Sequence, residues 1–330
     1  MEEFIINLIP AIIAGFIIQV ILHEIGHFIG GKVTGWSFLF IQIYRFLIRR
    51  TDKGLRLLIT NDIGFQCIMY PGSINTKALI YTMGGCITNL LSALMGFILL
   101  FTVDVSPLMW LYVWCFSVFG IGLFFVNGRS SIKRVCNDRA CYNLLKINSQ
   151  ARLCHNSQLL IAKQLMKGLS YSEIGEEAIC LCNDIAKNDI EAYQVVLEYY
   201  YYLDMGNYMI LEQVLDKVRD KENISTELVH IIEMELIYVK LYLALRLHRK
   251  SYINLNDIEK AIKRYGKKGD IHTLRVGTVY KAYLYYVNQI NQEAAIIIDS
   301  TINDIKKSKY IYEGDKVFCI RQLMHMKGMM

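Results

Sequence analysis

The chain has 330 residues, of which 54% are hydrophobic, with a mean hydropathy of +0.28 and only 3 prolines. This composition is too apolar for a typical soluble protein of this length. The formal net charge of +6 is small, and the cations gather beside apolar segments, which indicates membrane topology rather than binding of nucleic acid.

The first apolar segment, about residues 4–31, is long enough to cross a bilayer and contains the motif His23-Glu24-Ile25-Gly26-His27. On a helix, this His-Glu-x-x-His spacing puts both imidazoles on one face, where they can share a zinc ion. Glu24 is then placed to act as general base on a water molecule that the zinc activates. Because an unpaired carboxylate in lipid costs several kcal/mol, a metal site is favoured over a helix with unrelated polar residues.

The following loop, residues 32–77, favours a small sheet over residues 36–70. Residues 36–48 are aromatic and β-branched, Asp52-Lys53-Gly54 is a turn signal, and residues 55–60 can form the returning strand. Residues 65–69 are expected to add a third strand. The edge of such a sheet could pair with an extended peptide, or the hairpin could merely cover the helix ends.

Two further segments, residues 78–103 and about 106–126, are free of charge and long enough to span a bilayer. Lysine and arginine are concentrated in the loop 32–77 and after residue 128, whereas only Asp104 carries charge between the second and third segments. The positive-inside rule therefore predicts a multi-pass protein of the cell membrane, with the lipid bilayer as a partner. The N-terminus is expected outside, and the loop and the C-terminal half are expected in the cytoplasm.

A catalytic zinc requires a third protein ligand, and the topology restricts the choice to the cytoplasmic ends of the other spans. Asp104 fails because it belongs to the opposite face, whereas Asp138 follows the inner end of the third span. Cys136 is a softer alternative ligand. Asp52 and Asp62 lie in the loop, where no helix is expected to hold them against the first span.

Residues 149–330 are more polar and periodic, which predicts an all-α, solenoid-like soluble domain resembling tetratricopeptide repeats. This domain is expected to bind a regulatory protein or peptide. The helices are expected at 157–169, 172–183, 190–203, 209–220, 226–247, 255–265, 271–290 and 292–307. The predicted fold class is thus mainly α: a three-span core over residues 1–148 with a small cytosolic β insertion, followed by the helical domain.

Within residues 1 to about 150, the chain resembles the site-2 protease family of intramembrane zinc metalloproteases. The resemblance rests on His23-Glu24-x-x-His27, on Gly84-Gly85-Cys86-Ile87-Thr88-Asn89 in the second span, and on Asn127 and Asp138. It implies a zinc metalloendopeptidase in which His23, His27 and Asp138 hold Zn²⁺, Glu24 is the general base, and the substrate is a membrane protein or peptide. It also implies that Asn89 and Asn127 offer amide groups to the substrate backbone or the oxyanion, although a polar contact between helices would equally explain them.

Two other readings remain open. The first is a catalytically inactive membrane scaffold that binds partners through its helical domain. It is favoured by Ser130 and Arg139, which stand where the family usually has proline and glycine, and opposed by the intact Glu24. The second, a metal carrier, is disfavoured because three spans make a small conduit and the second and third spans contain no charged residue.

Overall fold

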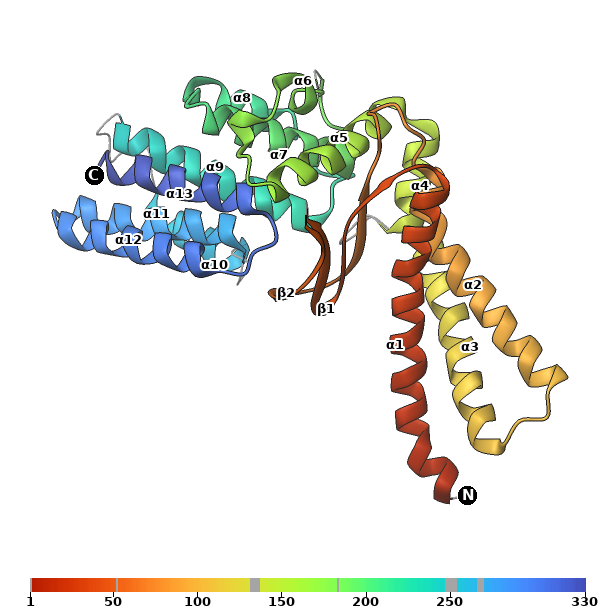
Figure 1. The fold of residues 1–330 in the computed structure, drawn as a ribbon. Coiled ribbons are helices and arrows are strands. Elements are labelled where there is room, and N and C mark those ends of the chain that lie inside the picture. Colours follow the sequence, from red (N-terminus) through yellow and green to blue (C-terminus); the bar gives the residue numbers. More distant parts are fainter. Residues whose placement is uncertain (1, 52, 131–136, 183, 247–253, 266–269) are drawn as a thin grey trace. The chain divides into compact units, whose positions relative to one another are not determined.

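The computed structural model describes residues 2–51, 53–130, 137–182, 184–246, 254–265 and 270–330. The chain forms two compact units, and the main division between them lies between Leu159 and Leu160. The N-terminal unit holds three long helices, a β-hairpin and the start of a helical segment, and the C-terminal unit is built from helices (Figure 1). The mainly α fold with a small sheet, expected from the sequence, is confirmed.

The three long helices of the N-terminal unit are α1 (Glu2–Val33), α2 (Leu79–Thr102) and α3 (Pro107–Gly128), and each packs against the other two. All three are long and apolar enough to cross a membrane. Many of their large apolar side chains point away from the protein, as expected for surfaces in contact with lipid; examples are Ile6, Met95 and Phe101. The predicted spans agree with these helices to within two residues at every end.

Glycines allow α1 and α2 to approach closely at the level of the His-Glu-x-x-His motif. A Cβ added to Gly26 would overlap the carbonyl oxygen of Gly84, and a Cβ on Gly84 would overlap that of Gly26. Small residues commonly allow such contacts between helices in membranes. The Gly84-Gly85 pair therefore brings the α2 backbone directly against the motif.

The loop between α1 and α2 forms a two-stranded antiparallel hairpin of β1 (Ser37–Thr51) and β2 (Gly54–Tyr70). Gly54 has φ +108°, a turn conformation that favours glycine. The predicted third strand is wrong: residues 55–60 and 65–69 belong to the single strand β2. Tyr44 pairs with Gly64 and Phe46 pairs with Ile59, so β2 has more residues than β1 between these two pairs. A register shift in the hairpin accommodates the additional residues of β2.

Two helices follow α3: α4 (Asp138–Ile147), which was not predicted, and α5 (Ser149–Met166). Asn137 caps α4, because its Oδ1 accepts from the backbone N–H of Ala140 at 3.1 Å. The Asn137 Nδ2 donates to the carbonyls of Arg129 at 2.7 Å and Val126 at 3.1 Å. One side chain thus starts α4 and ties its first residue, Asp138, to the end of α3.

The C-terminal unit contains a series of helices joined by short connections. After the 3₁₀ turn Tyr171–Glu173, they are α6 (Glu176–Ile179), α7 (Asp189–Asp204), α8 (Leu211–Asp216), α9 (Thr226–Arg246), α10 (Leu255–Tyr265), α11 (Ile271–Val287), α12 (Asn291–Lys307) and α13 (Glu313–Lys327), with a second 3₁₀ turn, Tyr208–Ile210, before α8. Seven predicted helices match α5 and α7–α12, although α5 and α8 differ in their bounds. The predicted helix at 172–183 is wrong, since the described residues 172–182 contain only the end of the 3₁₀ turn and the short α6. The helix α13 was not predicted.

The last helix also contacts the first part of the same unit. α13 packs against α11, α12 and α7, and its Arg321 binds Asp204, the last residue of α7, at 2.8 Å. The hydroxyl of Tyr171 donates to Asp315 at 2.7 Å. These contacts connect the last helix of the C-terminal unit to the first segments of the same unit.

Candidate metal centre

One face of α1 presents the two imidazoles of the motif. His23 and His27 lie four residues apart on the helix, and their Nε2 atoms are 3.2 Å from each other. His23 and the intervening Glu24 are buried, with 8% and 5% of their surface exposed. The helical spacing predicted from the sequence is therefore present.

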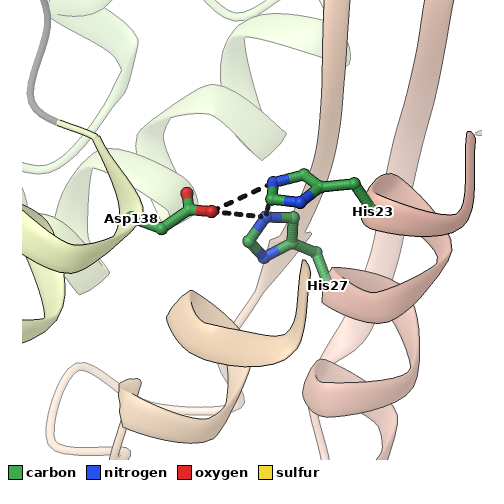
Figure 2. A group of neighbouring side chains, drawn as sticks. All are labelled: His23, His27 and Asp138. Atoms are coloured by element: carbon green, nitrogen blue, oxygen red, sulfur yellow. Dashed lines mark hydrogen bonds and ion pairs between the residues drawn. The ribbon is translucent and has the colours of Figure 1, made fainter. Parts of the chain in front are cut away.

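Asp138 approaches both rings from the first position of α4. Its Oδ2 lies 3.0 Å from the Nε2 of His23 and 3.5 Å from that of His27. Figure 2 shows the carboxylate and the two rings converging on one point. The three residues form a group that could hold a metal ion, as predicted from the position of Asp138 after the third span.

The spacing of the three atoms fits a small tetrahedral cation. Bonds of about 2.0–2.1 Å at tetrahedral angles place ligand atoms about 3.3–3.4 Å apart. The observed separations of 3.0, 3.2 and 3.5 Å bracket this value. Two imidazole nitrogens and one carboxylate oxygen are also the ligand types that zinc binds in catalytic sites, with one position left open.

Hydrogen bonds fix the tautomer of each imidazole. The His27 Nδ1 lies 2.8 Å from the carbonyl oxygen of Tyr81, which can only accept, so Nδ1–H donates and the lone pair resides on Nε2. The His23 Nδ1 lies 2.5 Å from the Oδ1 of Asn89, which assigns the same tautomer to His23. Both Nε2 lone pairs therefore face each other and the Asp138 carboxylate, an arrangement that requires a cation or added protons between them.

The amide of Asn89 is oriented by Gln19. The Nδ2 of Asn89 donates to the backbone carbonyl of Gln19 at 3.0 Å and to its Oε1 at 2.9 Å, so Oδ1 is the atom that faces His23. Gln19 in turn donates to the carbonyl of Phe116 on α3 at 3.2 Å. This buried network connects α1, α2 and α3 and holds the His23 ring at its Nδ1 atom.

Glu24 lies beside the three ligands and outside their group. Its carboxylate accepts a hydrogen bond from the backbone N–H of Cys67 in β2. The hairpin thus reaches the motif at Cys67.

The electrostatic environment keeps Asp138 ionised. Burial alone would raise the pKa of this carboxyl. When protons rather than a metal occupy the site, the hydrogen bonds and charges of the protonated His23 and His27 rings outweigh burial and hold the pKa of Asp138 well below its usual range. The thiol of Cys86 also donates to Oδ2, at 3.5 Å. An ionised carboxylate is the form that binds a metal.

The remaining predicted residues are placed as follows. Asn89 has its amide engaged by His23 and Gln19, while Asn127 is half-buried in the last turn of α3; a role of either toward a substrate stays a prediction. Asp104 lies in the connection between α2 and α3. Cys136 and Asp52 lie outside the described residues.

Sequence reasoning missed Gln19, Tyr81 and Cys67. Gln19 offered a signal, since it is a polar residue four positions before His23 inside an apolar span. Tyr81 contacts His27, and Cys67 contacts Glu24, through backbone atoms, and such contacts cannot be predicted from the residue type.

Comparisons with protein-family models, with curated proteins and with solved structures give no match. The chain therefore contains a His-His-Asp group capable of binding a metal, at the end of three helices that could cross a membrane.

Proposed function

We propose that this protein is an intramembrane zinc metallopeptidase similar to the site-2 proteases, which hydrolyses peptide bonds of membrane-embedded proteins or peptides. The observation that carries the proposal is the convergence of the two Nε2 lone pairs and the Asp138 carboxylate, with the carboxylate of Glu24 alongside. Such a set of donors within a bundle of apolar helices is costly unless it serves a metal.

The donors suit zinc best. Calcium and magnesium prefer shells of oxygen ligands, whereas two imidazoles and one carboxylate suit zinc. When bound there, zinc would supply Lewis-acid chemistry, which polarises a carbonyl and makes water easier to deprotonate.

The residues of the chain would carry the proton transfers. Glu24 removes a proton from water as the water oxygen attacks the scissile carbonyl carbon, and it then delivers that proton to the nitrogen when the C–N bond breaks. The backbone N–H of Cys67 holds the carboxylate in place. We further propose that Asn127, and Asn89 if its amide is released, bind the substrate backbone or the oxyanion.

The membrane arrangement follows from charge. Lys32 lies in the last turn of α1, Arg45, Arg49 and Arg50 lie in β1, and Arg129 follows α3. With these cations, the positive-inside rule predicts that these helix ends face the cytoplasm and that the N-terminus lies outside. His23 and His27 then lie near the cytoplasmic surface, where water can reach the site. A helical substrate must unwind there, because its backbone hydrogen bonds otherwise shield the scissile carbonyl.

The test compares cells that make the wild-type protein with cells that make Glu24→Gln. Gln keeps the size of the side chain and cannot accept a proton, so the purified variant should retain zinc while cleavage is lost. Quantitative proteomics of membrane fractions should then show at least one intact membrane protein accumulating and its cleavage product disappearing. Asp104→Asn, which removes an exposed carboxylate from the α2–α3 connection, is the matched control and should behave as wild type.

If the Glu24→Gln membranes show the same fragments as wild type, the peptidase proposal is wrong. The scaffold reading, in which the C-terminal unit binds a regulatory protein or peptide, would then take its place.

A further inference from the structure

Tyr81 joins two parts of the candidate site that belong to different segments. It lies in the first turn of α2 and is buried, with 7% of its surface exposed. Its backbone carbonyl accepts from the Nδ1 of His27 at 2.8 Å, and its side-chain hydroxyl donates to the carbonyl of Cys67 at 2.7 Å. One residue thus contacts both a metal ligand and the hairpin.

The backbone of Cys67 connects Tyr81 to Glu24. The carbonyl of Cys67 accepts from Tyr81, and the N–H of the same residue donates to the Glu24 carboxylate. The backbone N–H of Met69 also donates to the Tyr81 hydroxyl. The backbone of β2 at Cys67–Met69 is therefore contacted by Glu24 from α1 and by Tyr81 from α2.

Packing holds the Tyr81 ring in a single place. The ring lies against Trp36, with centroids 4.6 Å apart and planes inclined by 30°. On α1, a Cβ added to Gly31 would overlap the sulfur of Met69 and lie 3.3 Å from the Tyr81 ring, so the absence of a side chain there makes room for both residues. Trp36 is itself buried, with 2% exposed, which leaves the hydroxyl little freedom to find another partner.

From these contacts we propose that Tyr81 is a positioning residue, which aligns the general base Glu24 through the backbone of Cys67 while orienting the ligand His27 through its own carbonyl. This inference rests on the proposed function. The Cys67 N–H would then orient the Glu24 carboxylate toward the attacking water. Because the two contacts use different atoms, removing the hydroxyl disturbs Glu24 and leaves the support of His27 intact.

The first test measures hydrogen exchange of the Cys67 backbone amide in the zinc-loaded full chain in detergent. Glu24→Ala removes the acceptor of this amide, so exchange should accelerate about fivefold, which corresponds to about 1 kcal/mol at 1.4 kcal/mol per tenfold. Glu24→Gln keeps an acceptor and should keep the protection. Tyr81→Phe should also accelerate exchange of the Cys67 amide, whereas Tyr112→Phe, which removes a hydroxyl from α3 beside Ala11, Leu111 and Cys115, should not.

The second test separates the hydroxyl from the carbonyl. Tyr81→Phe should retain the zinc content and zinc affinity of wild type, because the carbonyl that supports His27 is unchanged. With the substrate identified from the Glu24→Gln membranes, kcat should fall about tenfold at unchanged KM. A merely structural role would instead lower thermal stability and zinc content together.

The inference is overturned if the Cys67 amide exchanges at the wild-type rate in both Glu24→Ala and Tyr81→Phe, even when Glu24→Gln abolishes cleavage. Conversely, coupled exchange in a protein that cleaves nothing would leave the Tyr81–Cys67–Glu24 connection standing and refute the peptidase proposal.

Discussion

The Nε2 atoms of His23 and His27 lie 3.2 Å apart although each ring has already donated its Nδ1–H to an oxygen. Two neutral imidazoles in this state repel each other, and the Oδ2 of Asp138, 3.0 Å from His23, adds a third electron-rich atom. One divalent cation stabilises all three, whereas protons would have to be taken up by both rings. This relationship is the physical basis of the proposed metal site.

Gly85 leaves the space that the His23 ring occupies, so Gly85→Ala should displace a metal ligand. A Cβ at this position would lie 2.6 Å from the His23 Nε2. We expect zinc affinity to fall by about 10–100-fold, the range seen when the support of a ligand is lost. Competition with a chelator would measure it, and Gly122→Ala on α3, where a Cβ meets nothing within 4 Å, is the control. Equal affinities in the two variants would contradict the placement of His23.

Asn89 fixes the tautomer of His23, so Asn89→Ala should weaken zinc binding without removing a ligand. The hydrogen bond of 2.5 Å to Nδ1 is lost, and the ring can then rotate or shift its proton to Nε2. Zinc affinity is expected to fall by about 10–100-fold. Thr102→Ala, at the exposed end of the same helix, should have no effect. If Asn89→Ala bound zinc as tightly as wild type, Asn89 would be free to serve the substrate instead.

Gly314 allows α13 to pack against the segment before α7. A Cβ at Gly314 would overlap the carbonyl oxygen of Leu169 and lie 3.0 Å from the Cα of Leu165. Gly314→Ala should therefore destabilise the C-terminal unit by about 1–3 kcal/mol, as overpacking does, while the zinc content is unchanged. Thermal unfolding and limited proteolysis would show it. Gly277→Ala in α11, which meets nothing within 4 Å, should be neutral or stabilising.

His155 should make the N-terminal unit sensitive to acid. Burial lowers the pKa of His155 to about 4 in the folded protein, below the usual value of about 6.5. Between these values the unfolded chain binds the additional proton, so the free energy of unfolding should drop by about 1–2 kcal/mol between pH 7 and pH 5. His155→Phe, which keeps a ring near Trp36, should reduce this loss. Thermal unfolding at the two pH values measures the difference, and an identical loss in the variant would assign the acid sensitivity to other groups.

The long helices were predictable because a bilayer demands about twenty apolar residues, and composition alone reveals such segments. The soluble segments were harder. Asn61, Asp62 and Gly64 resemble a turn in the sequence, yet β2 continues past them because a register shift accommodates the extra residues. The helix α13 was not predicted, although it carries recognisable signals: Glu313 and Asp315 lie in its first turn and Lys327 lies in its last.

The metal ligands were predictable for a different reason. His23 and His27 have a helical spacing with a known chemistry. Asp138 could be chosen as the third ligand because it follows the end of the third span that lies on the same side of the membrane as the two histidines. The contact of Cys67 with Glu24 was not predictable, because it depends on the register of β2 against α1 and uses the backbone. Nor was the role of Asn137, whose cap holds Asp138 against α3.

The most direct test of the metal site is the zinc content of the purified full-length protein after loading and extensive dialysis. Wild type and Glu24→Gln should each retain close to one zinc per chain, while His23→Ala, His27→Ala and Asp138→Ala should lose it and Asp104→Asn should keep it. A wild-type protein that retains no zinc, or an Asp138→Ala variant that holds zinc as tightly as wild type, would contradict the proposed three-ligand site.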